Sequence, residues 1–211
     1  MAIYSVDTHP MDGGKMFCTA GRDQYVRLYD RRYISATQNE APPMKKFCPH
    51  HLVRNAVLSR VAFLSNNRLH LSQIDSETKA NVTCAVFNYD GSEVIGSYND
   101  DDVYLFKTDH SDGADYRKRY QGHRNRMTGA YSGDCVTRDQ GGLQVQELAF
   151  FKSFHILAVK GVNFYGQRSE YVVSGSDCGH IFVWDKEAEC IVNMMDADEK
   201  GAVSRVHHDV G

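Results

Sequence analysis

The sequence lacks an excess of either charge. Its 211 residues include 24 Lys and Arg and 27 Asp and Glu, for a formal net charge of −3, so charge alone indicates neither a nucleic-acid nor a membrane partner. No apolar run approaches the roughly 18 residues that cross a bilayer. The first residues, Met1–Asp7, lack the basic and apolar regions of a secretory signal. We therefore expect a soluble globular protein in the cytoplasm or nucleus.

Several motifs of chemistry are also missing. The six cysteines form no Cys-x-x-Cys pair, so we expect buried, reduced thiols. No Walker A sequence is present and no Gly-x-Gly-x-x-Gly follows an expected strand, so the usual signals of a nucleotide cofactor are absent. A serine hydrolase would need a Gly-x-Ser-x-Gly elbow, which the sequence does not contain. The sequence therefore predicts that the chain is not an enzyme and has no cofactor.

Tryptophan occurs once, and its surroundings are the most informative part of the chain. Trp184 lies in Gly175–Asp185, a polar turn followed by apolar and aromatic residues and then an acid; weaker copies occupy Gly21–Asp30 and Ser97–Phe106. Such repeats are typical of β-propeller blades, and short β-branched and aromatic runs around them predict four antiparallel strands per blade. Beyond the repeats themselves, we expect strands at Ile3–Val6, Lys15–Ala20, Met44–Cys48, Val82–Phe87, Glu93–Ser97, Tyr116–Tyr120, Val159–Phe164, Tyr171–Ser174 and Cys190–Met194.

The spacing of the repeats is too long. Asp23, Asp100 and Asp177 follow one another at 77 residues, whereas a blade of this kind takes about 40–45. The surplus falls in two segments without the repeat pattern, approximately 54–75 and 126–158, which we interpret as insertions; degenerate blades are the alternative. A further strand begins at Gly201 and stops. We therefore expect residues 1–211 to form a single, all-β, incomplete propeller of about three blades and a stub, since rings close with about four to eight blades.

These blades resemble those of the WD-repeat proteins, and more narrowly the cullin-4-associated factors that act as substrate receptors of ubiquitin ligases. The resemblance covers more than half of the chain, over Ile3–Pro10, Gly21–Arg32, Lys46–His51, Ser97–Phe106, Tyr120–Asn125 and Val159–Trp184. It implies a protein-interaction module that docks a ligase adaptor in a cullin-4 RING complex and holds a protein substrate, while other subunits transfer ubiquitin.

The departures from the family pattern leave two alternatives open. The two surplus segments lie where that pattern is continuous, and they read like translated intron or alternative exon sequence. The family's other blades and its acidic N-terminal region are not part of this sequence. The chain is then either a receptor as described, a generic WD-repeat scaffold of another assembly, or a truncated or alternatively spliced product without function.

The resemblance assigns partner binding to Tyr29, Asp30 and Arg32. In the family, an aromatic-Asp-x-Arg sequence at the end of a blade's third strand presents its arginine to the adaptor. An acid can orient the planar guanidinium for bidentate contact, which lysine cannot reproduce. An ordinary surface ion pair is the alternative for these residues. The later copy, Trp184–Glu187, lacks the arginine.

A second set of residues has a structural interpretation. His123, Ser174, Asp177 and Trp184 match the types that form a buried hydrogen-bonded tetrad in WD repeats, because buried polar groups need partners. Serine, histidine and aspartate are also the members of a catalytic triad, but the run around Ser174 is an apolar strand. We therefore expect a structural tetrad, whose geometry depends on the segment between His123 and Trp184.

Three other clusters are weaker candidates. Cys48–His51 and Cys178–His180 contain zinc-ligand types, but their spacing matches no zinc finger or ribbon. Asp100–Asp102 lacks the glycine and distal glutamate of a calcium loop. Basic and aromatic residues alternate over Tyr116–Arg126, as in nucleic-acid-binding segments, but an outer strand explains them equally well. We expect no bound metal and no nucleic-acid partner.

Overall fold

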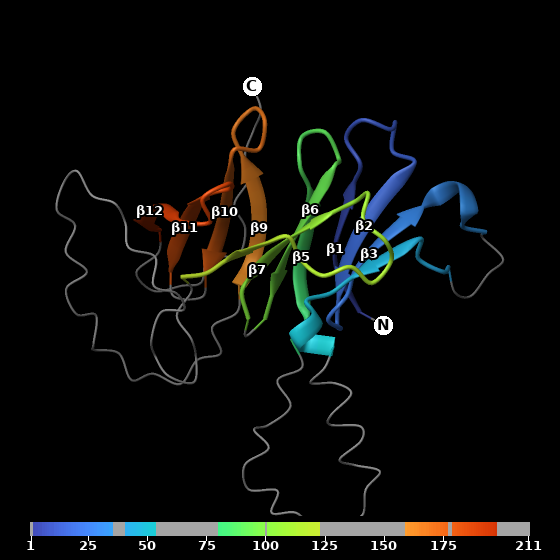
Figure 1. Cartoon of the computed structure of the whole chain (residues 1–211), viewed down its shortest axis with the longest axis horizontal. Coiled ribbons are helices and arrows are strands. Elements are labelled where there is room, and N and C mark those ends of the chain that lie inside the picture. Colours follow the sequence, from blue (N-terminus) through green and yellow to red (C-terminus); the bar gives the residue numbers. More distant parts are fainter. Residues whose placement is uncertain are drawn as a thin grey trace, which may run out of the picture.

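The computed structural model describes residues 2–35, 41–53, 80–99, 101–122, 159–176 and 179–197. Their strands form three four-stranded antiparallel sheets, each with its strands in chain order, which stand next to one another (Figure 1). The expected all-β class with three four-stranded blades is confirmed. The two expected insertions and the strand after Gly201 lie outside the described residues. No helix in the described ranges is long and apolar enough to cross a membrane.

The strand bounds are as follows. The first sheet contains β1 (Ile3–Thr8), β2 (Met16–Gly21), β3 (Val26–Asp30) and β4 (Lys45–Phe47), with the short 3-10 helix η1 (Arg31–Tyr33) after β3. The second contains β5 (Val82–Phe87), β6 (Glu93–Tyr98), β7 (Val103–Lys107) and β8 (Lys118–Tyr120). The third contains β9 (Val159–Tyr165), β10 (Tyr171–Ser176), β11 (His180–Asp185) and β12 (Ile191–Asp196).

Equivalent positions in the sheets follow from the register of their two central strands. In each, an apolar residue of the second strand pairs with the aromatic residue near the end of the third: Phe17 with Tyr29, Val94 with Phe106, and Val172 with Trp184. These aromatic residues lie 77 and 78 residues apart. Asp177 therefore stands one place earlier in its repeat than Asp23 and Asp100 do. The equal spacing of the three acids does not mark equivalent positions in all three sheets.

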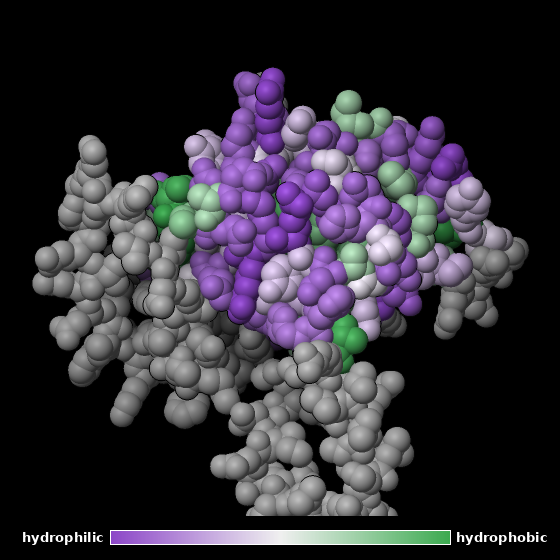
Figure 2. Space-filling view, in the orientation of Figure 1, coloured by the Kyte–Doolittle hydropathy of each residue, from purple (hydrophilic) through white to green (hydrophobic). Residues whose placement is uncertain are grey.

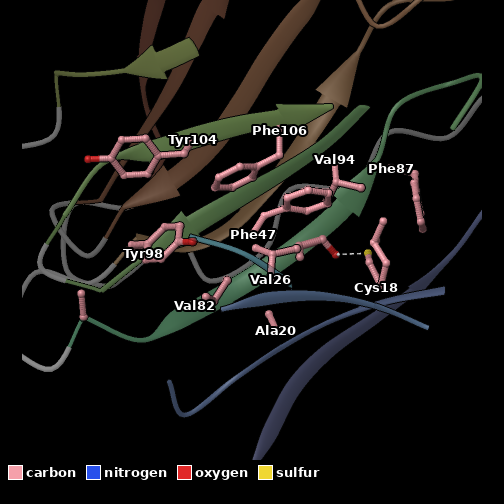
Figure 3. Close-up of a cluster of buried hydrophobic side chains, with 13 residues drawn as sticks. Cys18, Ala20, Val26, Phe47, Val82, Phe87, Val94, Tyr98, Tyr104 and Phe106 are labelled. Carbon is pink, nitrogen blue, oxygen red and sulfur yellow. Dashed lines mark hydrogen bonds between the residues drawn. The ribbon is translucent and has the colours of Figure 1, made fainter. Parts of the chain in front are cut away.

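The first hydrophobic core lies between the first and second sheets. Alternate side chains along a strand point to opposite faces, so residues two apart enter the same core. The main contributors, all at most 2% exposed, are Cys18, Val26, Leu28, Phe47, Val94, Tyr98, Tyr104 and Phe106. Figure 3 shows this cluster, in which the rings of Phe47 and Phe106 stack with centroids 5.6 Å apart and the Cys18 thiol donates to the Ala85 carbonyl at 3.6 Å.

The second core lies between the second and third sheets and uses the other face of the second. It contains Ile95, Val103, Leu105, Tyr120, Val162, Phe164, Val172, Phe182 and Trp184. The near-continuous apolar run of β7, which is buried on both faces, results from this position between two neighbours. Each fully buried aliphatic or aromatic side chain stabilises the fold by about 1.5–3 kcal/mol, so the second sheet is the best-anchored of the three.

The same polar contacts recur at both sheet junctions. Lys45 pairs with Leu28, and Lys118 pairs with Leu105, so the two lysines are equivalent. The Lys45 ammonium donates to the carbonyls of Thr108 and His110 at 2.7 Å. The Lys118 ammonium donates to the Glu187 carbonyl at 2.8 Å. Each lysine thus ties the outer strand of one sheet to the turn after the third strand of the next.

Gly96 permits the close approach of the first two sheets. A Cβ at this position would lie 2.8 Å from Cγ2 of Val26, across the first core. The equivalent residues, Thr19 and Ser174, do carry side chains. The Gly96 backbone therefore packs directly on the Val26 side chain, and this contact between the first two sheets requires a residue without a Cβ.

Candidate partner-docking site

Asp30 ends β3 and begins the turn that carries the candidate arginine. Its backbone is extended, with φ −109° and ψ 115°, and its carboxylate accepts a hydrogen bond from the Arg32 backbone N–H at 2.9 Å. A short acidic side chain at this position satisfies a donor that the first turn of a helix leaves without a partner. The sequence Asp30–Tyr33 therefore folds into η1 because of a local cap.

The same carboxylate also fixes the Arg32 side chain. The Nε atom of Arg32 lies 3.0 Å from Oδ1 and 3.1 Å from Oδ2 of Asp30, and an Nη atom lies 2.6 Å from Oδ2. The Asp30 side chain is only 4% exposed, whereas that of Arg32 is 59% exposed. The guanidinium is thus held by one edge, and its remaining N–H donors face solvent.

Electrostatics keeps this pair ionised. The hydrogen bonds from the Arg32 side chain, and then from its backbone N–H, lower the pKa of Asp30 to about 2. The hydrogen bond to Asp30 in turn raises the pKa of Arg32 above its ordinary value. Asp30 therefore carries its negative charge at any physiological pH, and it holds the arginine in one orientation.

Tyr33 adds an aromatic surface that the sequence motif did not identify. Its side chain is 75% exposed, and the guanidinium carbon of Arg32 lies 5.9 Å from the centre of its ring, within the range of a cation–π contact. The described surface seen in Figure 2 is mainly hydrophilic, with small, separate hydrophobic patches. An exposed arginine beside an exposed tyrosine is the composition typical of interface hot spots. The adjacency of the two residues in sequence was the available signal.

Tyr29 points to the opposite face of β3 from Asp30. Neighbouring strand residues point to opposite faces, and the Tyr29 ring stacks on Phe17, with centroids 5.2 Å apart and an interplanar angle of 12°. Tyr29 is half-buried there. Of the three residues assigned to partner binding, the structure brings Asp30 and Arg32 together and sets Tyr29 apart. The binding role of all three stays a prediction.

The equivalent turns of the other sheets lack the arginine. In the third sheet, Asp185 accepts hydrogen bonds from the backbone N–H groups of Glu187 and Ala188 at 2.9 and 2.8 Å. Glu187 occupies the place of Arg32, and Asp109 occupies it in the second sheet. An arginine on a capped turn is therefore a property of the first sheet within the three that the structure describes.

Two members of the expected tetrad are described. The Ser174 hydroxyl, in the middle of β10, is buried and donates to the Gly161 carbonyl of β9 at 3.0 Å. The Trp184 indole donates to the Gln121 carbonyl at 2.6 Å and thereby joins the third sheet to the segment after β8. Both contacts tie strands together. His123 and Asp177 lie outside the described residues, so the complete tetrad stays a prediction.

The weaker metal candidates have other partners. Burial raises the pKa of the Cys48 thiol to about 12, which opposes the thiolate that zinc requires. His50 and His51 lie 3.3 and 3.0 Å from the carboxylates of Asp115 and Asp101. No group of three or more potential metal ligands occurs in the part of the chain that the structure describes. Asp100 and Cys178 lie outside it.

Most of the described basic stretch is neutralised. Lys118 is buried and lies 2.8 Å from the Glu187 carboxylate. Arg119 lies 2.6 Å from the Asp102 carboxylate. Arg117 is exposed, and Arg124 and Arg126 fall outside the described ranges. The strand therefore uses its charges to join sheets, which weakens the nucleic-acid alternative.

Comparison with known proteins supports a WD-repeat interpretation. Residues 148–185 match the family model of the WD domain, G-beta repeat, and this stretch includes β9, β10 and β11. The chain is 40% identical over 52 residues to WD repeat protein iqw1 of Schizosaccharomyces pombe, which covers 25% of the chain and 6% of that protein. It is 44% identical over 41 residues to human WD and tetratricopeptide repeats protein 1, which covers 19% of the chain and 6% of that protein.

A third relative carries a functional name. The chain is 45% identical over 40 residues to human DDB1- and CUL4-associated factor 6, over 19% of the chain and 4% of that protein. The matched segments thus span about one twentieth of the length of these relatives. Together, the sheets and the family match show that the chain contains a WD40 repeat, a module that generally serves as a non-enzymatic scaffold for binding other proteins.

Proposed function

We propose that this chain acts as a substrate receptor of a cullin-4 RING ubiquitin ligase, in the cytoplasm or nucleus, and docks the ligase adaptor through Arg32. The observation that carries the proposal is the exposed guanidinium held on its inner edge by the buried Asp30 carboxylate. Such an arginine offers paired N–H donors to a carboxylate or carbonyl group of a partner. Ubiquitin transfer itself belongs to other subunits of the complex.

The family relationship supports the same partner. One relative is named for association with DDB1 and CUL4, and the stretches quoted above from this chain resemble factor eight of the same cullin-4-associated group. The adaptor we propose is accordingly a DDB1-type protein. The protein substrate is held elsewhere on the blades, on loops that connect the strands.

A generic WD-repeat scaffold is the second candidate function. The observation that favours it is the single arginine: the equivalent positions in the second and third sheets are the acids Asp109 and Glu187. An adaptor that contacted all three turns in the same way would meet charges of opposite sign. Under the receptor proposal, docking is instead confined to the first sheet and its neighbouring surface.

Charge reversal at Arg32 separates the two functions. The 211-residue chain and its Arg32→Glu variant are each mixed with purified DDB1-type adaptor, and the bound fraction is measured by pull-down. We expect Arg32→Glu to lower the affinity by at least about 30-fold, since interface arginines of this kind contribute about 2 kcal/mol or more. Equal recovery of adaptor by both proteins assigns the chain to another assembly.

A matched control removes the effect of net charge. Arg22 is also exposed, and it lies in the turn between β2 and β3, at the opposite end of β3 from Arg32. The Arg22→Glu variant has the same change in net charge and should bind the adaptor as the parent does. Loss of binding in both variants would indicate long-range charge attraction instead of docking at Arg32.

A further inference from the structure

In each described sheet, the turn after the third strand is tied to the turn before the second strand. Three equivalent hydrogen bonds do this, each from the backbone N–H of the residue after the third strand to the carbonyl of the residue before the second: Arg31 to Lys15 at 2.8 Å, Thr108 to Ser92 at 3.0 Å, and Lys186 to Glu170 at 3.0 Å. We call two turns joined in this way a turn pair. The turns before the second strands lie at the same end of the sheets, toward the top of Figure 1.

The first turn pair differs from the other two in charge. Three positions can be compared: the residue before the second strand and the two residues after the third strand. In the first sheet these are Lys15, Arg31 and Arg32, in the second Ser92, Thr108 and Asp109, and in the third Glu170, Lys186 and Glu187. The first turn pair thus has a base at every position, whereas each of the others carries one net negative charge.

The two acids beside the first turn pair do not neutralise its exposed bases. Asp30 is almost fully buried and holds one edge of Arg32. The Asp12 carboxylate accepts hydrogen bonds from the backbone N–H of Lys15 and of the next residue, at 3.0 and 2.7 Å. Lys15 and Arg31 are exposed, and neither side chain forms an ion pair with another residue of the described ranges. Their charges therefore face solvent.

The third turn pair has its single base neutralised. The Lys186 ammonium lies 3.0 Å from the Glu93 carboxylate, and both side chains are at most 13% exposed. Glu187 pairs with Lys118, but its own side chain is 75% exposed. In the second turn pair, Asp109 is exposed as well. The exposed charge at this end of the molecule therefore changes from positive at the first sheet to negative at the second and third.

We propose that the first turn pair is a basic docking surface for an acidic segment of the partner, and that Lys15 and Arg31 act there together with Arg32. This inference rests on the proposed receptor function and adds the chemistry of the partner's contact. An acidic segment is attracted by the bases of the first sheet and repelled by the exposed acids of the other two. The charge pattern therefore guides the partner to the first sheet in one orientation.

Association kinetics with the purified DDB1-type adaptor test the role of the two added bases. In about 0.15 M salt, Lys15→Gln and Arg31→Gln should each lower kon about twofold, roughly the screened effect of one unit charge at about 6 Å in water. The double variant should lower kon about fourfold and lose most of the salt dependence of the parent, with little change in koff. Stopped-flow fluorescence measures both rates.

Arg22→Gln is the matched control, because it removes the same charge from another exposed arginine. Arg22 lies beyond the opposite end of β3, whose five residues span about 16 Å. This exceeds the Debye length of about 8 Å at this salt concentration, so kon should equal that of the parent. Equal losses of kon in Arg22→Gln and Lys15→Gln would overturn the proposal, since net charge alone would then explain them.

A peptide of six glutamates with a neutral dye probes the surface without the adaptor. In low salt, fluorescence anisotropy should show that the parent and Arg22→Gln bind it, and that the Lys15→Gln and Arg31→Gln double variant does not. If the adaptor binds through Arg32 but the double variant keeps the parent's kon, the basic surface is wrong and the receptor function stands. If the adaptor does not bind at all, the receptor function is wrong, and the peptide alone decides: binding that the double variant loses supports the basic surface, and any other result overturns it.

Discussion

The turn after β3 and the turn after β11 begin in the same way, with an aspartate that accepts backbone hydrogen bonds from the residues that follow. They differ two residues later, where the first has Arg32 and the third has Glu187. The cap therefore recurs in both sheets, whereas the arginine is present in the first of these two turns and absent from the other. An exposed guanidinium that a buried carboxylate orients is what the proposed partner contact requires.

The two turns also differ in the aromatic residue that precedes each aspartate, Tyr29 in the first sheet and Trp184 in the third. Replacing these residues should give the largest changes in the free energy of unfolding. Trp184 is fully buried in the second core and hydrogen-bonded to Gln121, whereas Tyr29 is half-buried and stacks on Phe17. We expect Trp184→Ala to lower the free energy of unfolding by about 3–5 kcal/mol. Tyr29→Ala should lower it by about 1–2 kcal/mol. Urea denaturation measures both, and equal losses would contradict the difference in burial between the two aromatic residues.

Removal of the two caps should have a smaller effect and should separate stability from binding. Asp30→Ala and Asp185→Ala each remove a cap, so each should lower Tm by about 2–4 °C. Only Asp30→Ala should also weaken adaptor binding, by roughly tenfold, because the Arg32 guanidinium then loses its fixed orientation. Calorimetry and a binding titration on the same samples give both quantities. If Asp185→Ala weakens binding equally, the effect is global and the comparison fails.

Protonation of Asp30 should have the smallest effect on stability of these changes, but its pKa can be measured directly. Its folded pKa of about 2 lies below the ordinary value of about 3.9. The stabilisation from its charged form is therefore fully present above pH 3.9 and is lost as pH falls through about 2. Carboxyl chemical shifts followed by NMR should give this midpoint in the parent, and Arg32→Ala should raise it. An unchanged midpoint in the variant would assign the shift to the backbone cap alone.

Local pattern predicted most of the fold. The run Val82–Phe87 forms β5 with the expected bounds, and Ile3–Val6 and Glu93–Ser97 differ from β1 and β6 only at one end. These segments were predictable because apolar residues and turn residues alternate within a few positions. The register of the third repeat was not predictable in this way. The equal spacing of Asp23, Asp100 and Asp177 suggested that the three acids occupy equivalent positions, and the strand pairing does not support this.

Contacts between sheets were beyond the reach of sequence reasoning. Lys45 and Lys118 reach acceptors that lie 63 to 69 residues away, and no local pattern marks them as partners. The same applies to Arg119, whose pairing with Asp102 removes it from a surface that the sequence made look basic. For the proposed docking site, the resemblance named Tyr29, Asp30 and Arg32 together, and their binding role stays a prediction. That Asp30 holds Arg32 while the Tyr29 ring stacks on Phe17 could not be read from the sequence, because adjacency does not reveal the face of a strand.

Isothermal titration of a purified DDB1-type adaptor with the chain and with its Arg32→Lys variant tests the docking of Arg32 most directly. Lysine keeps the positive charge but cannot hold Asp30 with one edge and a partner with another. The account predicts that Arg32→Lys raises the Kd at least about tenfold, with only a small change in Tm, since an exposed ion pair contributes little to stability. Equal Kd values for the two proteins would contradict it.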